Sequence, residues 1–364
     1  MNYHIINCNN ITHVLANGYI GVGMAFDDSS TRKLLNSCKI NYSMFADMKT
    51  VAPGDMVFIH AGEYIYGAFA AASVFREDPN ATNCFRCANI HYKVNPNIQG
   101  SGWRNLVSAN LAVPAGDIRQ LSVSHFQDAH GNNLCYPNGI LANEVFDLRR
   151  KGRIWSIPER WKYPDSARTI RPIMPSEAEE LLKLLERENS DSDNKVTLTS
   201  KNMGGMADID LILNPAVAED EKIVEAWICE QLHNGKLDHI FGNLSCFGNN
   251  VQMGYLQGID ILGLQKSART EKYKIIELKI TPLILTNNYD VFRQVMGYMD
   301  WVMGFIVEND PRRVEGFIVA KSFDNQCAEF TENHNKVNYG RQIHLVQYLY
   351  LPPTHNCICM GLIL

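Results

Sequence analysis

The chain has 364 residues, enough for two domains of usual size. Hydrophobic residues make up 46% and charged residues 20%, which is ordinary for a soluble globular protein. The net charge of −5 excludes nucleic-acid binding through a globally basic surface, so any such binding must use a local basic groove. No run of 18 apolar residues predicts a membrane span. Ten irregularly spaced cysteines are typical of reduced thiols, and we expect a cytoplasmic protein.

Residues 1–174 are predicted to form a strand-rich first domain. Pro53, Gly54 and Asp55 indicate a turn before the strand expected over residues 56–60. An apolar-periodic stretch ending before Gly152 predicts a helix over residues 141–150. The expected strands cover residues 3–7, 19–26, 56–60, 64–75, 89–94 and 106–113, with a short helix near 31–37 and a return strand over 153–158.

Two tryptophans of this region lie beside arginines. Trp103 precedes Arg104, and Trp155 follows Arg153 after one intervening residue. An aromatic face can stack on a base while a neighbouring cation meets the phosphate, so both tryptophans are candidates for base binding. An equally good interpretation places both in the hydrophobic core.

Residues 1–171 show a faint resemblance to the EVE-like members of the PUA superfamily. The likeness is carried by the GYIGVGMAF segment at residues 18–26, the Pro-Gly-Asp step into an apolar strand and the glycine-containing strand that follows. It implies a small β-barrel with helices that accommodates a modified or flipped base, at a cost that stacking on aromatic faces partly offsets.

Residues 175–217 are predicted to be a helix and a linker. The pattern over residues 175–189 indicates an amphipathic helix, begun by Ser176 and Glu179 as a capping box. Residues 190–200 are rich in Ser, Asp and Asn, which indicates a linker. A second domain is expected over residues 218–364.

One predicted β-hairpin of this second domain carries the strongest functional signal. Apolar runs over residues 259–264 and 273–280 flank a polar turn. Asp260 lies on the first strand, while Glu277 and Lys279 lie two residues apart on the second and therefore share a face. Charged groups in apolar strands need a partner, and carboxylate oxygens suit Mg²⁺. The alternative is an ordinary charge pair on a sheet surface.

Two predicted helices flank the hairpin. The helix before it offers Glu221 as a further carboxylate, with Glu225 on the same face as the alternative. The helix after it carries Gln294 and Tyr298, which share a face because they lie four residues apart. These helices cover residues 221–232 and 291–302, and they are followed by expected strands within 312–323 and over 342–351 and by an apolar tail, 356–364.

The order Asp, Glu-x-Lys and Gln-x-x-x-Tyr resembles the PD-(D/E)XK nuclease superfamily, its RecB-like branch and, within that branch, the NucS-type endonuclease domain. The resemblance covers about residues 219–350, although no proline precedes Asp260. It implies an α/β restriction-endonuclease-like fold with a mixed sheet. The implied ligands of Mg²⁺ or Mn²⁺ are Glu221 (or Glu225), Asp260 and Glu277. The implied catalytic residues are Asp260, Glu277, Lys279, Gln294 and Tyr298.

We therefore expect a two-domain α/β protein that cleaves DNA as a metal-dependent endonuclease. The resemblance of the first domain implies cleavage directed by a modified base, as in a restriction or defence enzyme. Two alternatives stay open: a structure- or mismatch-specific repair nuclease of NucS type, and a non-catalytic module that binds nucleic acid. A homodimer and a partner protein from a defence system are further open expectations.

Overall fold

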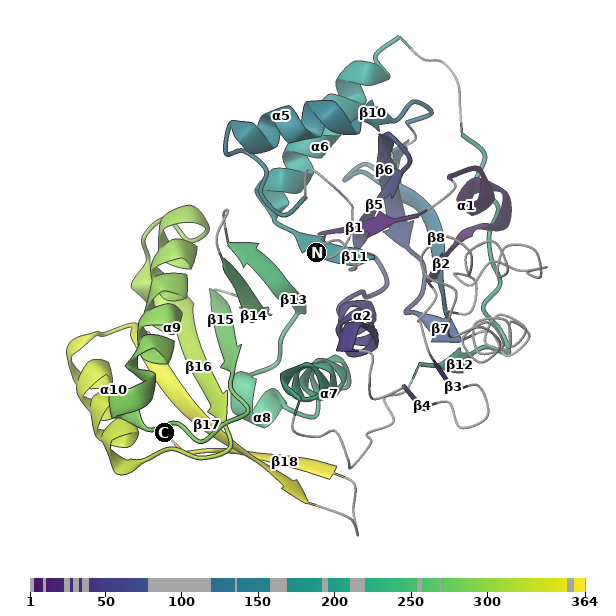
Figure 1. Cartoon of the computed structure of the whole chain (residues 1–364). Helices are drawn as coiled ribbons and strands as arrows, with labels where there is room; N and C mark the ends of the chain where they lie inside the picture. The colour runs from purple at the N-terminus through teal and green to yellow at the C-terminus, as the bar shows by residue number, and fades with distance from the viewer. Residues whose placement is uncertain are drawn as a thin grey trace, which may run out of the picture. The chain divides into compact units, whose positions relative to one another are not determined.

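The computed structural model describes residues 3–8, 11–22, 27–28, 33–34, 39–77, 119–134, 136–157, 169–191, 196–209, 220–253, 257–268, 270–351 and 357–363. The chain divides into two compact units, Met1–Ile212 and Leu213–Leu364 (Figure 1). Within the described residues, no helix combines the length and the apolar character needed to cross a bilayer.

The first unit is built from a large mixed sheet, a separate two-stranded sheet of β3 and β4, and helices. Its helices are α1 (Ile11–Asn17), α2 (Lys39–Lys49), α5 (Ala142–Arg150) and α6 (Pro175–Glu188). Its strands are β1 (Tyr3–Asn7), β2 (Tyr19–Val22), β3 (Asp27–Asp28), β4 (Lys33–Leu34), β5 (Met56–Ala61), β6 (Tyr64–Ala71), β7 (Arg76–Glu77), β8 (Arg119–Gln127), β9 (Asn133–Leu134), β10 (Ile140–Leu141), β11 (Ile170–Ile173) and β12 (Ala207–Asp208).

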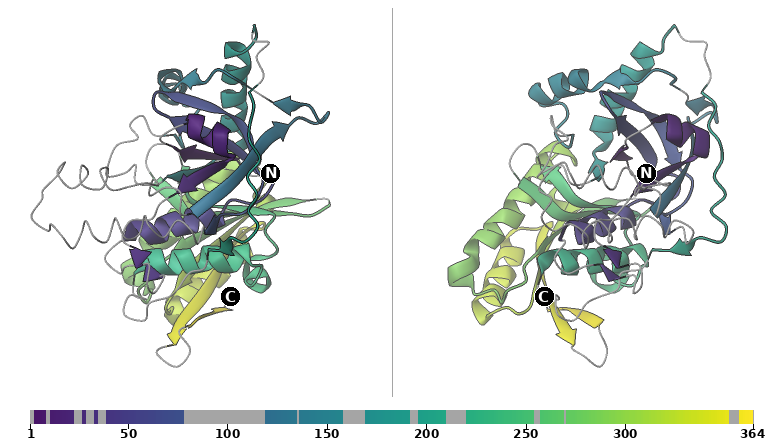
Figure 2. Two further views of the ribbon diagram at one scale, coloured as in Figure 1. Left: turned by 90° about the vertical axis from the view of Figure 1, so that its right-hand side faces the viewer. Right: turned by 45° about the vertical axis from the view of Figure 1, so that its right-hand side comes forward.

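The sheet of the first unit is mixed and curled (Figure 2). Its main path runs β11-β1-β5-β6-β8-β7-β12, with β10 joined to β6 and both β2 and β9 joined to β8. β1 runs parallel to β5, whereas β11, β6 and β8 add antiparallel neighbours. The closed small barrel implied by the PUA-like resemblance stays a prediction.

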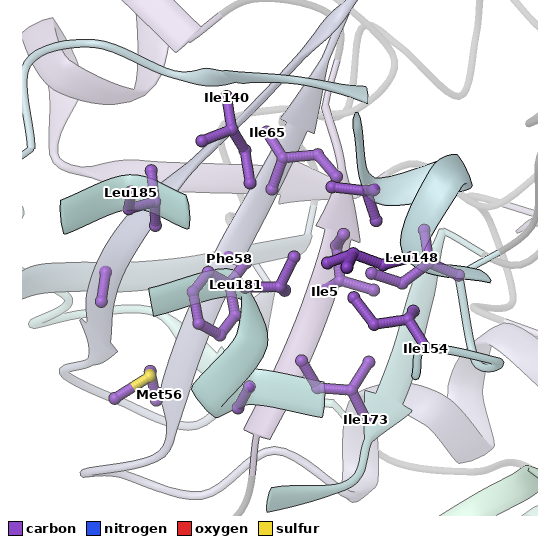
Figure 3. Packing of buried hydrophobic residues seen from close by; sticks show 14 residues of the cluster. Ile5, Met56, Phe58, Ile65, Ile140, Leu148, Ile154, Ile173, Leu181 and Leu185 are labelled. Atoms are coloured by element: carbon purple, nitrogen blue, oxygen red, sulfur yellow. The ribbon is translucent and has the colours of Figure 1, made fainter. Parts of the chain in front are cut away.

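The hydrophobic core of this unit lies between one face of the sheet and helices α5 and α6 (Figure 3). Ile5 and Phe58 point from β1 and β5 into the core. Leu148 of α5 and Leu181 of α6 meet them, and all four are buried. Helix α6 is therefore part of the core of the first unit.

The N-terminus of α6 differs from the prediction. The helix begins at Pro175, and the fully buried Glu177 accepts a hydrogen bond of 2.8 Å from the Met174 N–H. Glu177 also accepts from the Ser156 hydroxyl at 2.5 Å, so its carboxylate joins the helix to the preceding loop. The capping box predicted with Ser176 and Glu179 was wrong, because Pro175 takes the first helical position and shifts the cap two residues earlier.

The structure confirms some of the other elements predicted for the first unit and corrects others. Strand β1 and helix α5 are confirmed, whereas residues 33–34 form strand β4 where a helix was expected. Residues 153–157 are not a strand, and β11 is the strand that returns to pair with β1. The strands expected over 89–94 and 106–113 lie outside the described residues, as does Trp103.

Part of the predicted linker packs on the first unit. The Thr199 N–H donates to the Leu15 carbonyl at 3.0 Å. The Lys201 ammonium lies 4.9 Å from the centre of the Tyr19 ring. The described end of this segment therefore follows the surface of the unit.

The second unit contains one mixed sheet and four α-helices among its described residues. The helices are α7 (Glu221–His233), α8 (Asp238–Phe241), α9 (Leu285–Phe305) and α10 (Asn325–Val337). The strands are β13 (Cys246–Met253), β14 (Gln257–Lys266), β15 (Glu271–Leu278), β16 (Val314–Ala320), β17 (Arg341–Leu351) and β18 (Cys357–Leu362), in that order across the sheet. The predicted α/β unit with a mixed sheet is confirmed at this level.

The direction of the strands changes in the middle of this sheet. β13, β14 and β15 form an antiparallel meander, while β15, β16 and β17 run parallel. Helices α9 and α10 connect the parallel strands and pack side by side, with Phe292 and Phe330 rings 5.0 Å apart (Figures 1 and 2). Phe241 of α8 meets Phe317 on the other face of β16 at 5.1 Å. The sheet is thus covered by helices on both faces.

A glycine allows α9 to approach the sheet closely. A Cβ added at Gly316 would lie 2.7 Å from Val295 Cγ1 and 3.0 Å from Met299 Sδ. The absence of a side chain at Gly316 therefore lets this part of α9, which carries Gln294 and Tyr298, lie directly on the strand beside β15.

Candidate active site

The hairpin of β14 and β15 places two carboxylates opposite each other. Ile261 pairs with Ile276, so the next pair along the antiparallel register is Asp260 and Glu277. Residues directly opposite each other in an antiparallel pair project from the same face. Asp260 Oδ2 also accepts a hydrogen bond of 2.8 Å from the Leu278 N–H, which ties this carboxylate to the end of β15.

Lys279 lies one residue beyond the end of β15. Its ammonium donates to Glu277 Oε1 at 2.5 Å and to the Leu278 carbonyl at 2.8 Å. Its backbone N–H donates to the Val319 carbonyl of β16 at 2.8 Å. The lysine is therefore held on both its backbone and its side chain, with its charge beside Glu277.

Glu277 is the group of this site whose ionised form is most strongly disfavoured. Only 1% of the residue is exposed, and its Oε2 has no hydrogen-bond partner among the described residues. Burial and the negative charges of Asp260 and, less, Glu221 raise the pKa of Glu277 to about 8, although Lys279 opposes the shift. A buried acceptor without a donor is rare in native proteins and calls for a ligand or ion as its explanation.

Glu221, one of the two helical carboxylates, interacts electrostatically with the site. It is the first residue of α7, and burial followed by the charge of Asp260 raises its pKa, while Lys279 opposes this. Glu225 is fully buried and forms an ion pair with Lys222. We therefore retain Glu221 as the helical carboxylate of the candidate site.

Tyr298 and Gln294 support the start of β14. The Tyr298 hydroxyl donates to the Gly258 carbonyl at 3.0 Å and accepts from Gln294 Nε2 at 2.5 Å. Burial raises the pKa of Tyr298 to about 12, and the charges of Glu277 and Asp260 add to this against the Gln294 hydrogen bond. A neutral tyrosine thus holds the strand two residues before Asp260.

The donor set suits a divalent cation bound by few protein ligands. In the described part of the chain, no three or more His, Cys, Asp or Glu side chains lie close enough together to hold a metal ion by themselves. The described hydrogen bonds engage Oδ2 of Asp260 and Oε1 of Glu277, leaving a second oxygen on each. Mg²⁺ typically binds through one or two carboxylates, with waters and substrate phosphate as its other ligands. The two opposed carboxylates therefore fit this ion.

Two backbone groups of the site were missed in the sequence. The Gly258 carbonyl and the Leu278 N–H bind Tyr298 and Asp260. No sequence motif could indicate them, because every residue carries a carbonyl and nearly every residue carries an N–H.

In the first unit, the structure describes one of the two candidate base-binding tryptophans. Trp155 is half-buried after α5, its backbone N–H donates to Glu177 Oε1 at 2.7 Å, and its backbone carbonyl accepts from Arg149. The loop is therefore anchored at Trp155. Because Trp103 is outside the described residues, its pairing with Trp155 stays a prediction.

No protein-family model and no curated protein matches the chain. Similar solved structures include a repair endonuclease from Pyrococcus abyssi, 16% identical over 34% of this chain and 47% of that one, with a TM-score of 0.22. Another, an EndoMS complex with double-stranded DNA, is 15% identical over 41% of this chain and 52% of that one, with a TM-score of 0.24. The chain spans about half the length of each.

Proposed function

We propose that the chain is a divalent-metal-dependent nuclease that hydrolyses DNA phosphodiesters. The observation that carries the proposal is Glu277, a buried carboxylate whose Oε2 has no hydrogen-bond partner among the described residues, opposite Asp260 and paired with Lys279. Burying like charges together is costly and is common where a protein holds a cation or carries out catalysis. A lysine beside two carboxylates adds a donor for a phosphate oxygen.

Asp260 and Glu277 would hold Mg²⁺ or Mn²⁺, and a cation bound there polarises a phosphoryl oxygen and makes a bound water more acidic. Burial acts to lower the pKa of Lys279. The hydrogen bond to Glu277 and the negative charges of Glu277, Asp260 and Glu221 have a larger effect, so the pKa of Lys279 is raised above its usual value. Lys279 is therefore charged at neutral pH, and its ammonium offsets negative charge on the phosphate in the transition state.

Glu221 and the Tyr298–Gln294 pair have supporting roles in this proposal. Glu221 accepts a hydrogen bond from a water at the edge of the site and keeps that water oriented. Tyr298 holds the Gly258 carbonyl, which keeps β14 in place, and the Gln294 amide keeps the hydroxyl aimed at that carbonyl. Both effects act on the position of groups and not on covalent chemistry.

Selection of the DNA is assigned in this proposal to the first unit. Trp155, whose backbone is held by Glu177 and Arg149, is the candidate to stack on a modified base, with Trp103 as its proposed partner. Such a sensor would make the chain a restriction or defence enzyme. Stacking on an aromatic side chain contributes about 1–3 kcal/mol per base, so Trp155→Ala should weaken binding of modified DNA by that amount.

The test is cleavage by the purified full chain in Mg²⁺, Mn²⁺ or EDTA, on matched modified, unmodified and mismatched duplexes. We expect cleavage only with a divalent cation, and a loss of about 100- to 1,000-fold in Asp260→Asn, Glu277→Gln and Lys279→Met. Glu332→Gln, on an exposed carboxylate of α10, is the matched control and should cut normally. Preference for the modified duplex supports the sensor, while preference for the mismatched one favours the repair alternative. DNA binding without cleavage in either metal would establish the non-catalytic alternative.

A further inference from the structure

One residue of β13 has an unusual backbone beside the candidate site. Asn250 has φ of +46°, in the left-handed region, although it lies within a strand. The other described non-glycine residues with positive φ, Glu308 and Asn309, lie in the loop after α9. Strand residues rarely adopt this conformation, and asparagine tolerates it better than most residues. Such outliers persist where the surrounding structure holds them, often at functional sites.

The register puts this outlier opposite Asp260. Asn249 pairs with Ile261 and Val251 with Ile259, so Asn250 faces Asp260 across the β13–β14 ladder. β13 is the first strand of the sheet, next to β14. The distortion is therefore located at the strand that flanks the first carboxylate.

The side chain of Asn250 lies against Gly258, its diagonal neighbour on β14. A Cβ added at Gly258 would be 2.5 Å from Asn250 Oδ1, so the amide occupies the space that a side chain at Gly258 would need. The carbonyl of the same glycine accepts the hydroxyl of Tyr298. Gly258 is thus contacted by Asn250 from β13 and by Tyr298 from α9.

We propose that Asn250 is a positioning residue for Asp260. This inference rests on the proposed function of the Asp260–Glu277 site. The two carboxylates can share a cation only if the strand that carries Asp260 is held opposite Glu277 on β15. Asn250 packs against β14 two residues before Asp260 and acts with Tyr298 to hold it there. Glycine could adopt the same backbone but would lack the amide that contacts Gly258.

The test uses Asn250→Gly, Gly258→Ala and the double variant in the full chain. Asn250→Gly keeps the left-handed backbone and removes the amide, and we expect Mn²⁺ affinity by calorimetric titration and kcat to fall about 10- to 100-fold, with KM for DNA little changed. Gly258→Ala should lower Mn²⁺ affinity and kcat in the same way, because its methyl group displaces the amide of Asn250. Because the double variant removes both the amide and the clash, its loss should be no larger than that of Asn250→Gly alone.

Asn309→Gly is the matched control, since it removes an amide from a left-handed asparagine in the loop after α9 and should leave both readouts at the wild-type level. Metal-free thermal melts establish that each variant is folded. Wild-type Mn²⁺ affinity and kcat in folded Asn250→Gly would overturn the inference, as would additive losses in the double variant. Failure of the proposed function looks different: wild type itself would neither bind Mn²⁺ at Asp260 and Glu277 nor cut DNA.

Discussion

At the scale of single residues, Glu277 shows how a site can be built at the expense of stability. It is buried, it faces Asp260, and one of its oxygens has no partner in the described structure. Its raised pKa of about 8 means that the folded chain without a cation disfavours the ionised form. Functional sites commonly carry such local costs, and removing them stabilises the protein while activity is lost.

Glu277→Gln should therefore stabilise the metal-free chain. The amide keeps the size of the side chain and removes its repulsion from Asp260, and we expect a gain on the order of 1 kcal/mol in the free energy of unfolding. The loss of the ion pair with Lys279 limits the gain. Urea denaturation in EDTA measures it, with cleavage in Mg²⁺ measured in parallel. A variant less stable than wild type would show that the Lys279 ion pair outweighs the repulsion.

At the scale of elements, the closeness of α9 to the sheet depends on Gly316. Gly316→Ala would place a methyl group 2.7 Å from Val295 Cγ1, and we expect a loss of about 1–3 kcal/mol as α9 shifts. Gly297→Ala is the matched change within α9, on its exposed side with nothing within 4 Å. It should stabilise by about 1 kcal/mol, because alanine is the better helix former. The melting temperature should fall in Gly316→Ala and rise in Gly297→Ala. An equal fall in both variants would contradict the close packing of α9 on the sheet.

Strands β15 and β16 are also joined by a charge cluster away from the candidate site. Glu315 forms ion pairs with Lys272 at 2.6 Å and with Lys274, which is buried. Burial acts to raise the pKa of Glu315. The hydrogen bonds and positive charges of the two lysines have a larger effect, so the pKa of Glu315 is lowered below its usual value. The folded state therefore favours the ionised carboxylate.

Because the folded-state pKa of Glu315 lies below its unfolded value, its contribution to stability is present above the unfolded pKa and is lost as pH falls through the folded one. Glu315→Gln should cost about 3 kcal/mol at pH 7, since it leaves Lys274 buried without its partner. The difference from wild type should shrink in acid. Urea denaturation of both proteins at pH 7 and at pH 3 measures this, and a difference independent of pH would show that the carboxylate charge is not the cause.

The sequence predicted those elements whose signals are local. The hairpin, the helices at Glu221 and Tyr298, and strand β1 follow from periodicity within one segment, and they are confirmed. The N-terminus of α6 was misplaced because the partners of Glu177 come from a loop distant in sequence, at Ser156. The backbone of Asn250 could not be predicted for the same reason, since its contact with Gly258 exists only once β13 and β14 are paired.

At the scale of the whole molecule, the two units should respond separately to metal. Each has its own sheet, and the candidate metal ligands all belong to the second unit. A ligand that binds only the folded state stabilises by about 2.7 kcal/mol at 100 times its dissociation constant. Mn²⁺ should therefore raise the unfolding transition of the second unit in a calorimetric scan and leave that of the first unchanged.

Substitutions in the two cores identify the transitions. Leu181→Ala should reduce the free energy of unfolding of the first unit by about 2–5 kcal/mol and so lower the temperature of its transition. Gly316→Ala should lower the transition temperature of the second unit. Asp260→Asn should abolish the shift with Mn²⁺. A shift that persists in Asp260→Asn, or that falls on the transition lowered by Leu181→Ala, would place the metal elsewhere in the chain.

The position of both carboxylates on one hairpin also has a consequence for the order of folding. Asp260 and Glu277 come together through the short loop between β14 and β15, whereas the parallel pairing of β15 with β16 requires the whole of α9 as a crossover. Hairpins close in microseconds, while contacts distant in sequence form later because longer loops must be ordered first. The two charges should thus meet in a nascent chain still open to water, before α9 buries them. Pulse-labelled hydrogen exchange tests this order: the amide of Leu278, bonded to Asp260, should become protected before the amides of β16.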